Sequence, residues 1–175
     1  GNCAGTGSPP ACGDTPDPTP AATGGAATCV PTYANYTEGL EVGYRWYDAH
    51  GVTPAFAFGH GLSYTTFGYS GLSVGADRAV SATVTNTGKV RGAEVAQLYL
   101  RYPEAAGEPF KQLRGFQKVM LEPGATAIVH FALPDRWLST WDEGAHAWKL
   151  ARGTFAVHVG ASVADIRLSS NFTVE

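Results

Sequence analysis

The second half of the chain carries a period-two pattern of hydrophobic and polar residues. Residues 80–85 show it clearly, because Val, Ala and Val alternate with Ser, Thr and Thr up to the turn Asn86-Thr87-Gly88. Such alternation indicates β-strands that bury one face. Together with a strand entered near Leu72, the pattern predicts strands at 80–85, 93–102, 114–121, 127–133, 155–159 and 166–174. About seven short strands separated by regularly spaced turns are typical of a two-sheet β-sandwich.

The alternation also predicts which side chains face the core. We expect the inward residues to be Val80, Ala82 and Val84, then Val129, Phe131 and Leu133, then Phe155, Val157 and Val159. His130 and His158 occupy the opposite face in these strands. The segment 93–102 is apolar on both faces, which favours a central strand.

A glycine-rich hinge precedes the sandwich. Residues 56–72 read FAFGHGLSYTTFGYSGL, and no helical period fits them. Glycine allows backbone conformations closed to other residues, so Gly59-His60-Gly61 predicts a tight turn. We therefore divide the chain into an irregular N-terminal arm with the hinge, residues 1–64, and a sandwich, residues 65–175.

The arm changes character near its end. Residues 1–31 are rich in proline, glycine and alanine and predict a loop or linker. Residues 42–47 then alternate as a short strand, with Val42, Tyr44 and Trp46 on one face. This strand could pack on the chain's own sandwich or belong to the sheet of another domain. We favour the second interpretation, because both faces carry large side chains.

Several motifs resemble the C-terminal part of family 3 glycoside hydrolases. They are YTEGL at 36–40, VGYRWYD at 42–48, FGHGLSYT at 58–65, VTNTG at 84–88, EVAQLYL at 94–100, LRGF at 113–116, LSTWD at 138–142 and VGAS at 159–162. The resemblance covers residues 36–174. One departure is Glu41, at a position where the family usually carries a large apolar residue.

The resemblance implies an all-β, immunoglobulin or fibronectin type III-like sandwich, preceded by the end of an α/β domain. It implies an accessory role: the region would stabilise and position the catalytic domains of a β-glucosidase or β-xylosidase. Its partners would be those catalytic domains. The residues expected at that interdomain surface are Tyr44, Arg45, Trp46, Asp48, Phe56, Phe58 and His60.

Composition fits a secreted, β-rich protein, since 44% of the residues are hydrophobic and only 15% are charged. The net charge of −3 and the lack of a basic cluster argue against nucleic acid. No apolar run approaches the roughly 20 residues that span a bilayer, so we expect no membrane association. The chain has no signal peptide at its start, and Gly1-Asn2-Cys3 looks like a cut inside a larger protein or a processed end.

The three cysteines, Cys3, Cys12 and Cys29, all lie in the arm. In an oxidising compartment two of them are expected to pair, and Cys3–Cys12 is our first choice because it closes a short Gly/Pro-rich loop. The pairings Cys3–Cys29 and Cys12–Cys29 remain open. Zinc is a poor alternative, because residues 1–30 hold no histidine.

The chain offers weak candidates for catalysis. A retaining glycosidase needs two carboxyl groups roughly 5–5.5 Å apart, and the possible pairs are Glu38/Glu41 and Asp142/Glu143. Neither matches the settings of the family's nucleophile and acid/base residues, which lie upstream of this region. We therefore expect no catalytic residue, no metal and no cofactor in this chain. An independent small glycosidase is the corresponding rival hypothesis.

Three tryptophans form the best lead for binding. Indole rings stack on sugar rings, so exposed Trp137, Trp141 and Trp148 could bind polysaccharide. The alternative is core packing, because Leu138 and Trp141 lie in a motif that the family uses structurally. A polysaccharide-binding module is therefore the second rival to the accessory role.

Overall fold

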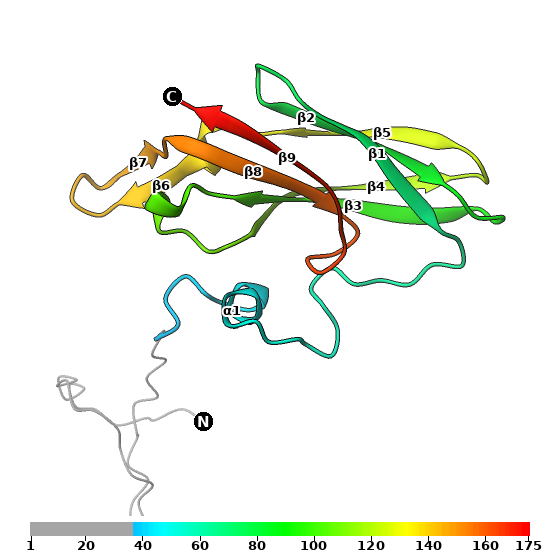
Figure 1. Cartoon of the computed structure of the whole chain (residues 1–175), viewed down its shortest axis with the longest axis horizontal. Coiled ribbons are helices and arrows are strands. Elements are labelled where there is room, and N and C mark those ends of the chain that lie inside the picture. Colours follow the sequence, from blue (N-terminus) through cyan, green and yellow to red (C-terminus); the bar gives the residue numbers. More distant parts are fainter. Residues whose placement is uncertain (1–36) are drawn as a thin grey trace, which may run out of the picture. The chain divides into compact units, whose positions relative to one another are not determined.

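Two antiparallel sheets form the body of the protein. The computed structural model describes residues 37–175, and Glu38–Glu175 form one compact unit. One sheet has the strand order β1-β2-β5 and the other β4-β3-β8-β9; β6 and β7 form a separate hairpin (Figure 1). The strands are β1 (Phe67–Val74), β2 (Ala79–Asn86), β3 (Gly92–Arg101), β4 (Gln112–Leu121), β5 (Thr126–Ala132), β6 (Ser139–Asp142), β7 (Ala147–Leu150), β8 (Gly153–Gly160) and β9 (Ile166–Val174).

The remaining regular elements are short helices. They are α1 (Tyr44–His50) and the 3-10 helices η1 (Glu104–Ala106) and η2 (Asp135–Leu138). The seven strands of the two larger sheets correspond to the seven predicted, so the all-β, fibronectin type III-like sandwich is confirmed.

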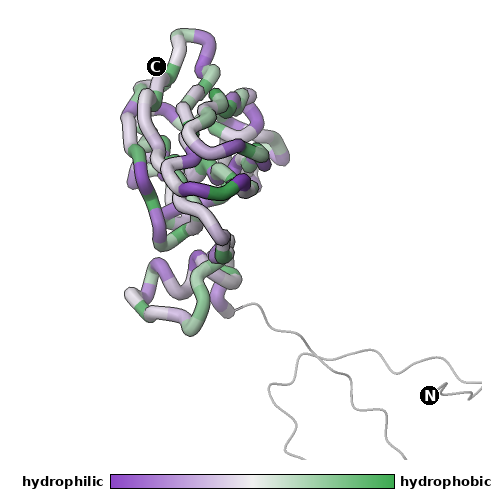
Figure 2. The backbone as a smooth tube through the Cα atoms, turned by 90° about the vertical axis from the view of Figure 1, so that its right-hand side faces the viewer, coloured by the Kyte–Doolittle hydropathy of each residue, from purple (hydrophilic) through white to green (hydrophobic). Residues whose placement is uncertain are grey.

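The core lies between the two larger sheets. Every residue predicted to face inward on β2 and β8 is almost fully buried, and so are Val129, Phe131 and Leu133. Ala96, Leu98, Tyr99 and Leu100 of β3 are fully buried as well, which confirms β3 as a central strand between β4 and β8. Figure 2 shows hydrophobic and hydrophilic residues interspersed along the backbone of the sandwich.

The turn after β2 is tied to the sandwich by a buried amide. Asn86 is fully buried, and its Nδ2 donates hydrogen bonds to the carbonyls of Val90 (2.8 Å) and Leu121 (2.9 Å). Its Oδ1 accepts from the Thr65 hydroxyl (2.6 Å) and from the Gly88 N–H (3.0 Å). All of the amide's polar atoms are thus paired, as a buried polar group requires.

The predicted strand at 42–47 is wrong, because Tyr44–His50 form the helix α1. Two glycines with positive φ bound the helix: Gly43 at φ 64° and ψ −130°, and Gly51 in the left-handed region at φ 62°. The first of these conformations is essentially restricted to glycine. With seven residues, α1 is too short to be stable alone, so its contacts with the sandwich must hold it.

Candidate functional site

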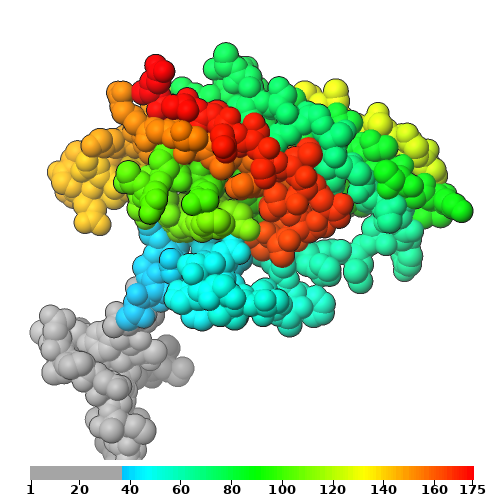
Figure 3. All heavy atoms as spheres, in the orientation of Figure 1, coloured from blue at the N-terminus to red at the C-terminus, as the bar shows by residue number. Residues whose placement is uncertain are grey.

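The hinge and α1 lie along one side of the sandwich, where Figure 3 shows their cyan atoms against it. We call the segment from Leu40 to Tyr64 the docking segment. It holds all seven residues predicted at the interdomain surface. Its inner face contacts the sandwich, and its outer face is open in this chain.

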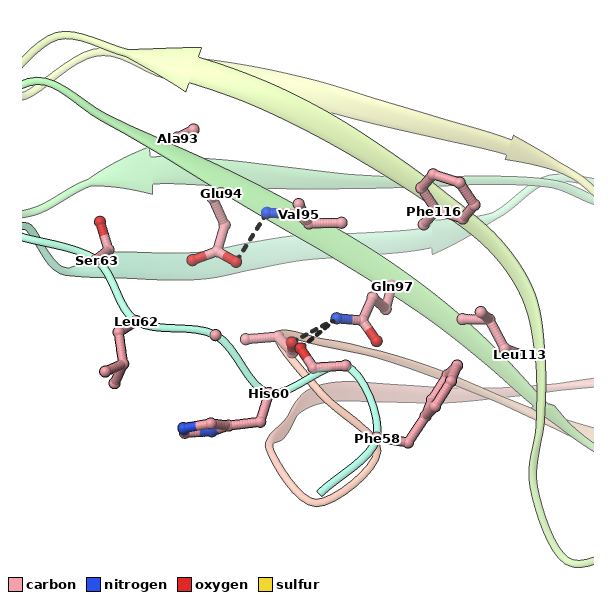
Figure 4. Close-up of a pocket in the computed structure, with 13 residues that line it drawn as sticks. Phe58, His60, Leu62, Ser63, Ala93, Glu94, Val95, Gln97, Leu113 and Phe116 are labelled. Atoms are coloured by element: carbon pink, nitrogen blue, oxygen red, sulfur yellow. Dashed lines mark hydrogen bonds between the residues drawn. The ribbon is translucent and has the colours of Figure 1, made fainter. Parts of the chain in front are cut away.

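A buried glutamine joins the hinge to the sandwich. Gln97 of β3 donates from Nε2 to the carbonyls of Gly59 (3.1 Å) and Ala161 (2.6 Å) (Figure 4). Its Oε1 accepts from the Tyr99 hydroxyl (2.6 Å). Gly59 has φ 79°, and a Cβ there would lie 2.1 Å from Gln97 Oε1. Glycine is therefore required for this close approach.

Contacts between aromatic rings hold α1 against the sandwich. Tyr44 stacks on Phe58 with ring centroids 4.5 Å apart, and it meets Tyr99 edge to face at 6.2 Å. The Tyr44 hydroxyl accepts a hydrogen bond from the Leu113 N–H of β4 (2.8 Å). Burial raises the pKa of Tyr99 well above its ordinary value, and the nearby Tyr44 and Asp48 add to that rise. Tyr99 therefore stays neutral and serves as a hydrogen-bond donor.

Lys111, the residue that precedes β4, forms an ion pair with the inner face of the docking segment. Lys111 Nζ lies 3.4 Å from Asp48 Oδ2 of α1, and it donates to the Val163 carbonyl at 2.7 Å. The Lys111 side chain is only 13% exposed, so this pair is screened less by solvent than a surface ion pair. The Val163 N–H in turn donates to the Phe58 carbonyl at 3.0 Å.

The outer face of the docking segment exposes large apolar side chains. Trp46 is 37% exposed and Phe56 is 79% exposed. Other large apolar side chains of the docking segment are exposed as well: Leu40, Val42, Tyr47, Val52, Phe58, Leu62 and Tyr64. So many exposed large apolar side chains within one segment are typical of an interaction site.

Six of the seven predicted interdomain residues separate into two groups, and Arg45 bonds within the docking segment. Tyr44, Asp48 and Phe58 contact the chain's own sandwich. Trp46, Phe56 and His60 are exposed, with the Trp46 ring stacked on His50 at 4.3 Å and His60 beside Phe56 at 5.8 Å. Arg45 Nη1 donates to the Leu40 carbonyl at 3.4 Å. That these residues meet another domain stays a prediction.

A hollow of about 490 Å³ opens between the hinge and strands β3 and β4. Phe58, Leu62, Val95, Leu113 and Phe116 line it, and the hinge forms its rim (Figure 4). Glu94 is its carboxylate, and that side chain accepts a hydrogen bond from the Val95 N–H at 2.9 Å. The lining is mainly apolar, which suits an inserted side chain better than a polar substrate.

The three tryptophans proposed to stack on sugars, Trp137, Trp141 and Trp148, lie in η2 and in the β6–β7 hairpin that follows it. Trp137 is partly buried against the core, as the packing alternative predicts. Trp141 and Trp148 are cross-strand partners in the hairpin, and each is 46% exposed.

Two of the carboxylates considered for catalysis interact with neighbouring residues of the chain. Asp142 Oδ1 accepts from the Ala145 N–H (2.9 Å) and so closes the β6–β7 turn. Glu41 lies 3.8 Å from His50.

Within residues 37–175, His, Asp and Glu side chains form no group of three that could hold a metal ion. No helix in that range is long and apolar enough to cross a membrane. Cys3 and Cys12, with Cys29, lie outside the described residues, so their pairing stays a prediction.

Sequence reasoning missed the residues that hold the docking segment to the sandwich. Gln97 carried a usable signal, because it is a polar residue inside a strand that is apolar on both faces. Lys111 and Leu113 carried none, since their partners Asp48 and Tyr44 are 63 and 69 positions away.

Comparison with known proteins agrees with this architecture. The family described as "Fibronectin type III-like domain" matches residues 94–163. The chain is 43% identical over 170 residues to "Probable beta-glucosidase D" of Aspergillus niger, covering 84% of this chain and 22% of that protein. It is 47% identical over 163 residues to "Probable beta-glucosidase L" of Aspergillus fumigatus, covering 80% of this chain and 22% of that protein.

Solved structures show the same likeness. The β-D-glucoside glucohydrolase of Trichoderma reesei superposes with a TM-score of 0.77 at 37% identity, over 85% of this chain and 24% of that one. The β-glucosidase 3B of Thermotoga neapolitana, solved with α-D-glucose, gives a TM-score of 0.73 at 41% identity, over 79% and 20%. The chain thus spans less than a quarter of the length of the relatives that it matches.

Proposed function

Because the chain belongs to the fibronectin type III-like region of the family 3 glycoside hydrolases, we propose that it is an accessory domain of a larger enzyme. In this role it stabilises and positions the catalytic domains. The observation that carries the proposal is the two-faced docking segment. Its inner face is fixed to the sandwich by Tyr44, Gln97 and Lys111, whereas its outer face presents exposed Trp46 and Phe56.

The geometry favours the interpretation that this face contacts another domain, rather than the interpretation that it is a free surface. A segment that is fixed to the sandwich at Tyr44, Asp48 and Gly59 holds its outer aromatic side chains in defined positions. Rigid aromatic side chains bind a partner at low entropic cost and dominate the energy of interfaces. Because the relatives are much longer proteins that include this region, we propose the catalytic domains of the same enzyme as the partner.

We assign the parent activity as β-glucosidase rather than β-xylosidase. The four relatives reported above carry β-glucosidase or β-glucoside glucohydrolase names. Secretion of the parent is part of the proposal and rests on the composition of the chain. Cleavage of glycosides belongs to the parent, since Asp142 has a structural role in a turn and Glu41 lies beside His50.

A chimera tests the accessory role. The region of the Trichoderma reesei enzyme that this chain matches would be replaced by this chain, and the enzyme lacking that region would serve as the baseline. We expect the chimera to unfold at a higher temperature than the baseline and to hydrolyse an aryl β-glucoside. A chimera that is indistinguishable from the baseline would contradict the accessory role.

The chain alone tests the rival of an independent glycosidase. We expect no hydrolysis of aryl glucosides or xylosides. Turnover that disappears in Asp142→Asn or Glu38→Gln would overturn this expectation.

A further inference from the structure

A second hollow, of about 470 Å³, lies beside the β6–β7 hairpin and away from the hinge hollow. Its lining differs from that of the hinge hollow, because charged and amide side chains surround two indole rings. The rings are Trp141 and Trp148, and the polar groups come from the start of α1, from β4, from η2 and from the hairpin turn.

The two indoles have different free surfaces. Their ring centroids are 5.2 Å apart and their planes are inclined by 55°. The guanidinium of Arg136 lies over the Trp148 ring, a cation–π contact that fixes the guanidinium and covers one face of that ring. Trp141 is the better platform for an incoming ring, and it is 46% exposed.

Three guanidinium groups border this platform. Arg114 Nη2 donates to the Tyr102 hydroxyl (2.6 Å) and to Gln112 Oε1 (2.9 Å), and these bonds hold its guanidinium in place. Arg45 and Arg136 also line the hollow, and neither forms an ion pair within the described part of the chain.

Two carboxylates supply acceptors in the same hollow. Glu108 accepts from Gln112 Nε2 at 2.7 Å, and Glu143 lies on the hairpin turn. Sugar hydroxyls both donate and accept hydrogen bonds, and the C–H groups on one side of a glucose ring pack on an indole face. An anionic ligand would meet Glu108 and Glu143 as well as the arginines. Mixed charges around an aromatic platform therefore favour a neutral saccharide.

We propose that this hollow binds a short neutral β-glucan segment, with one glucosyl ring stacked on Trp141 and its hydroxyl groups bonded to Arg114, Arg45 and Glu143. The choice of glucose as the sugar rests on the proposed function, whereas the binding mode rests on the hollow alone. The site would hold a polymeric substrate beside the enzyme without taking part in hydrolysis.

Titration of the full chain with cellotetraose tests the site. Assigned NMR spectra of the chain should show shifts at the indole N–H of Trp141 and at the side chains of Arg114 and Gln112. The variant Trp141→Ala should bind about five- to tenfold more weakly, which corresponds to the loss of one aromatic contact. Because Trp141 is half exposed, this variant should fold, and Trp141→Phe should restore part of the affinity.

The matched control is Phe116→Ala, which removes a 69% exposed aromatic ring on β4 outside the hollow and should leave the affinity unchanged. Digalacturonate is the anionic comparison and should bind more weakly than cellotetraose. No shift with cellotetraose, an unchanged affinity in Trp141→Ala, or tighter binding of digalacturonate would each overturn the proposal. The titration uses this chain without catalytic domains, so its failure is separate from failure of the accessory role.

Discussion

At the residue scale, Asn86 shows how a polar side chain can specify this fold. The sequence assigns Asn86 to a turn, and the structure buries it completely, with hydrogen bonds to Thr65, Gly88, Val90 and Leu121. The turn was predictable because Asn-Thr-Gly follows an alternating strand. The burial was not, since it depends on Leu121, which is 35 positions away.

Asn86→Ala should destabilise the protein by about 2–4 kcal/mol, because it leaves the buried Leu121 carbonyl and the partly buried Val90 carbonyl without this donor. Urea unfolding measures the change. The control is Asn171→Ala on β9, where the side chain is exposed and the expected change is within about 0.5 kcal/mol. An equal effect of the two substitutions would contradict the role of Asn86.

His158 should make stability depend on pH. It is half-buried on β8, its Nδ1 is within hydrogen-bond distance of Ser169 Oγ (2.8 Å), and burial lowers its pKa from the ordinary value of 6.5, with Lys111 and Arg101 lowering it further. Below pH 6.5 the unfolded chain therefore takes up a proton before the folded chain does. The free energy of unfolding should fall as the pH falls below that value, and it should level off once the folded state is also protonated.

The variant His158→Gln should flatten this slope, and urea unfolding at a series of pH values from about 7 down to about 5 measures it. The matched control is His130→Gln on β5, an exposed position that should leave the slope in place. If both variants keep the slope, His158 is not its source.

At the element scale, the strands were predictable and the helix was not. The period-two alternation predicted a strand at 166–174, which has the same bounds as β9. It also predicted a strand at 93–102, and each end of β3 lies within one residue of that range. The same period-two alternation led to the wrong prediction of a strand where α1 lies. Tyr44 and Asp48 are four residues apart, so a helix brings both to the sandwich, whereas a strand pairs Tyr44 with Trp46. The backbone conformations at Gly43 and Gly51 decide between the two, and the sequence does not display them.

Tyr44→Phe should loosen α1 while keeping its ring stacked on Phe58. It leaves the Leu113 N–H without its acceptor, which should cost about 1–2 kcal/mol. Hydrogen exchange at the Leu113 amide should accelerate by at least about fivefold. The control Tyr47→Phe alters an exposed ring of the same helix and should leave the Leu113 rate unchanged. Equal rates in the two variants would mean that Tyr44 does not hold α1.

At the scale of the whole molecule, the sandwich was predictable but the attachment of the docking segment was not. Alternation reports on faces within one strand, whereas Gln97, Lys111 and Leu113 act on residues 38 to 69 positions away. The contacts place Glu38–Glu175 in one compact unit, and the boundary at residues 64 and 65 stays a prediction about folding.

Trimming the chain to residues 63–175 tests that boundary. The two sheets bury their core without help from the docking segment, so the trimmed protein should still unfold cooperatively. Its midpoint should be lower than that of the full chain, because the contacts of Tyr44, Gly59 and Asp48 are lost. Thermal unfolding of the two proteins side by side makes the comparison. Loss of the transition on trimming would show that the docking segment belongs to the folding core.

The accessory role requires that the outer face of the docking segment meets the catalytic domains. The most direct measurement is thermal unfolding of the chimera described above, with Trp46→Ala and Phe56→Ala introduced together. The control chimera carries Met120→Ala and Ile128→Ala, which remove exposed apolar side chains on β4 and β5, away from the hinge hollow. We predict that the first pair lowers the unfolding midpoint of the chimera by several degrees and leaves the isolated chain unchanged, whereas the control pair changes neither. Equal midpoints for the two chimeras would contradict the claim.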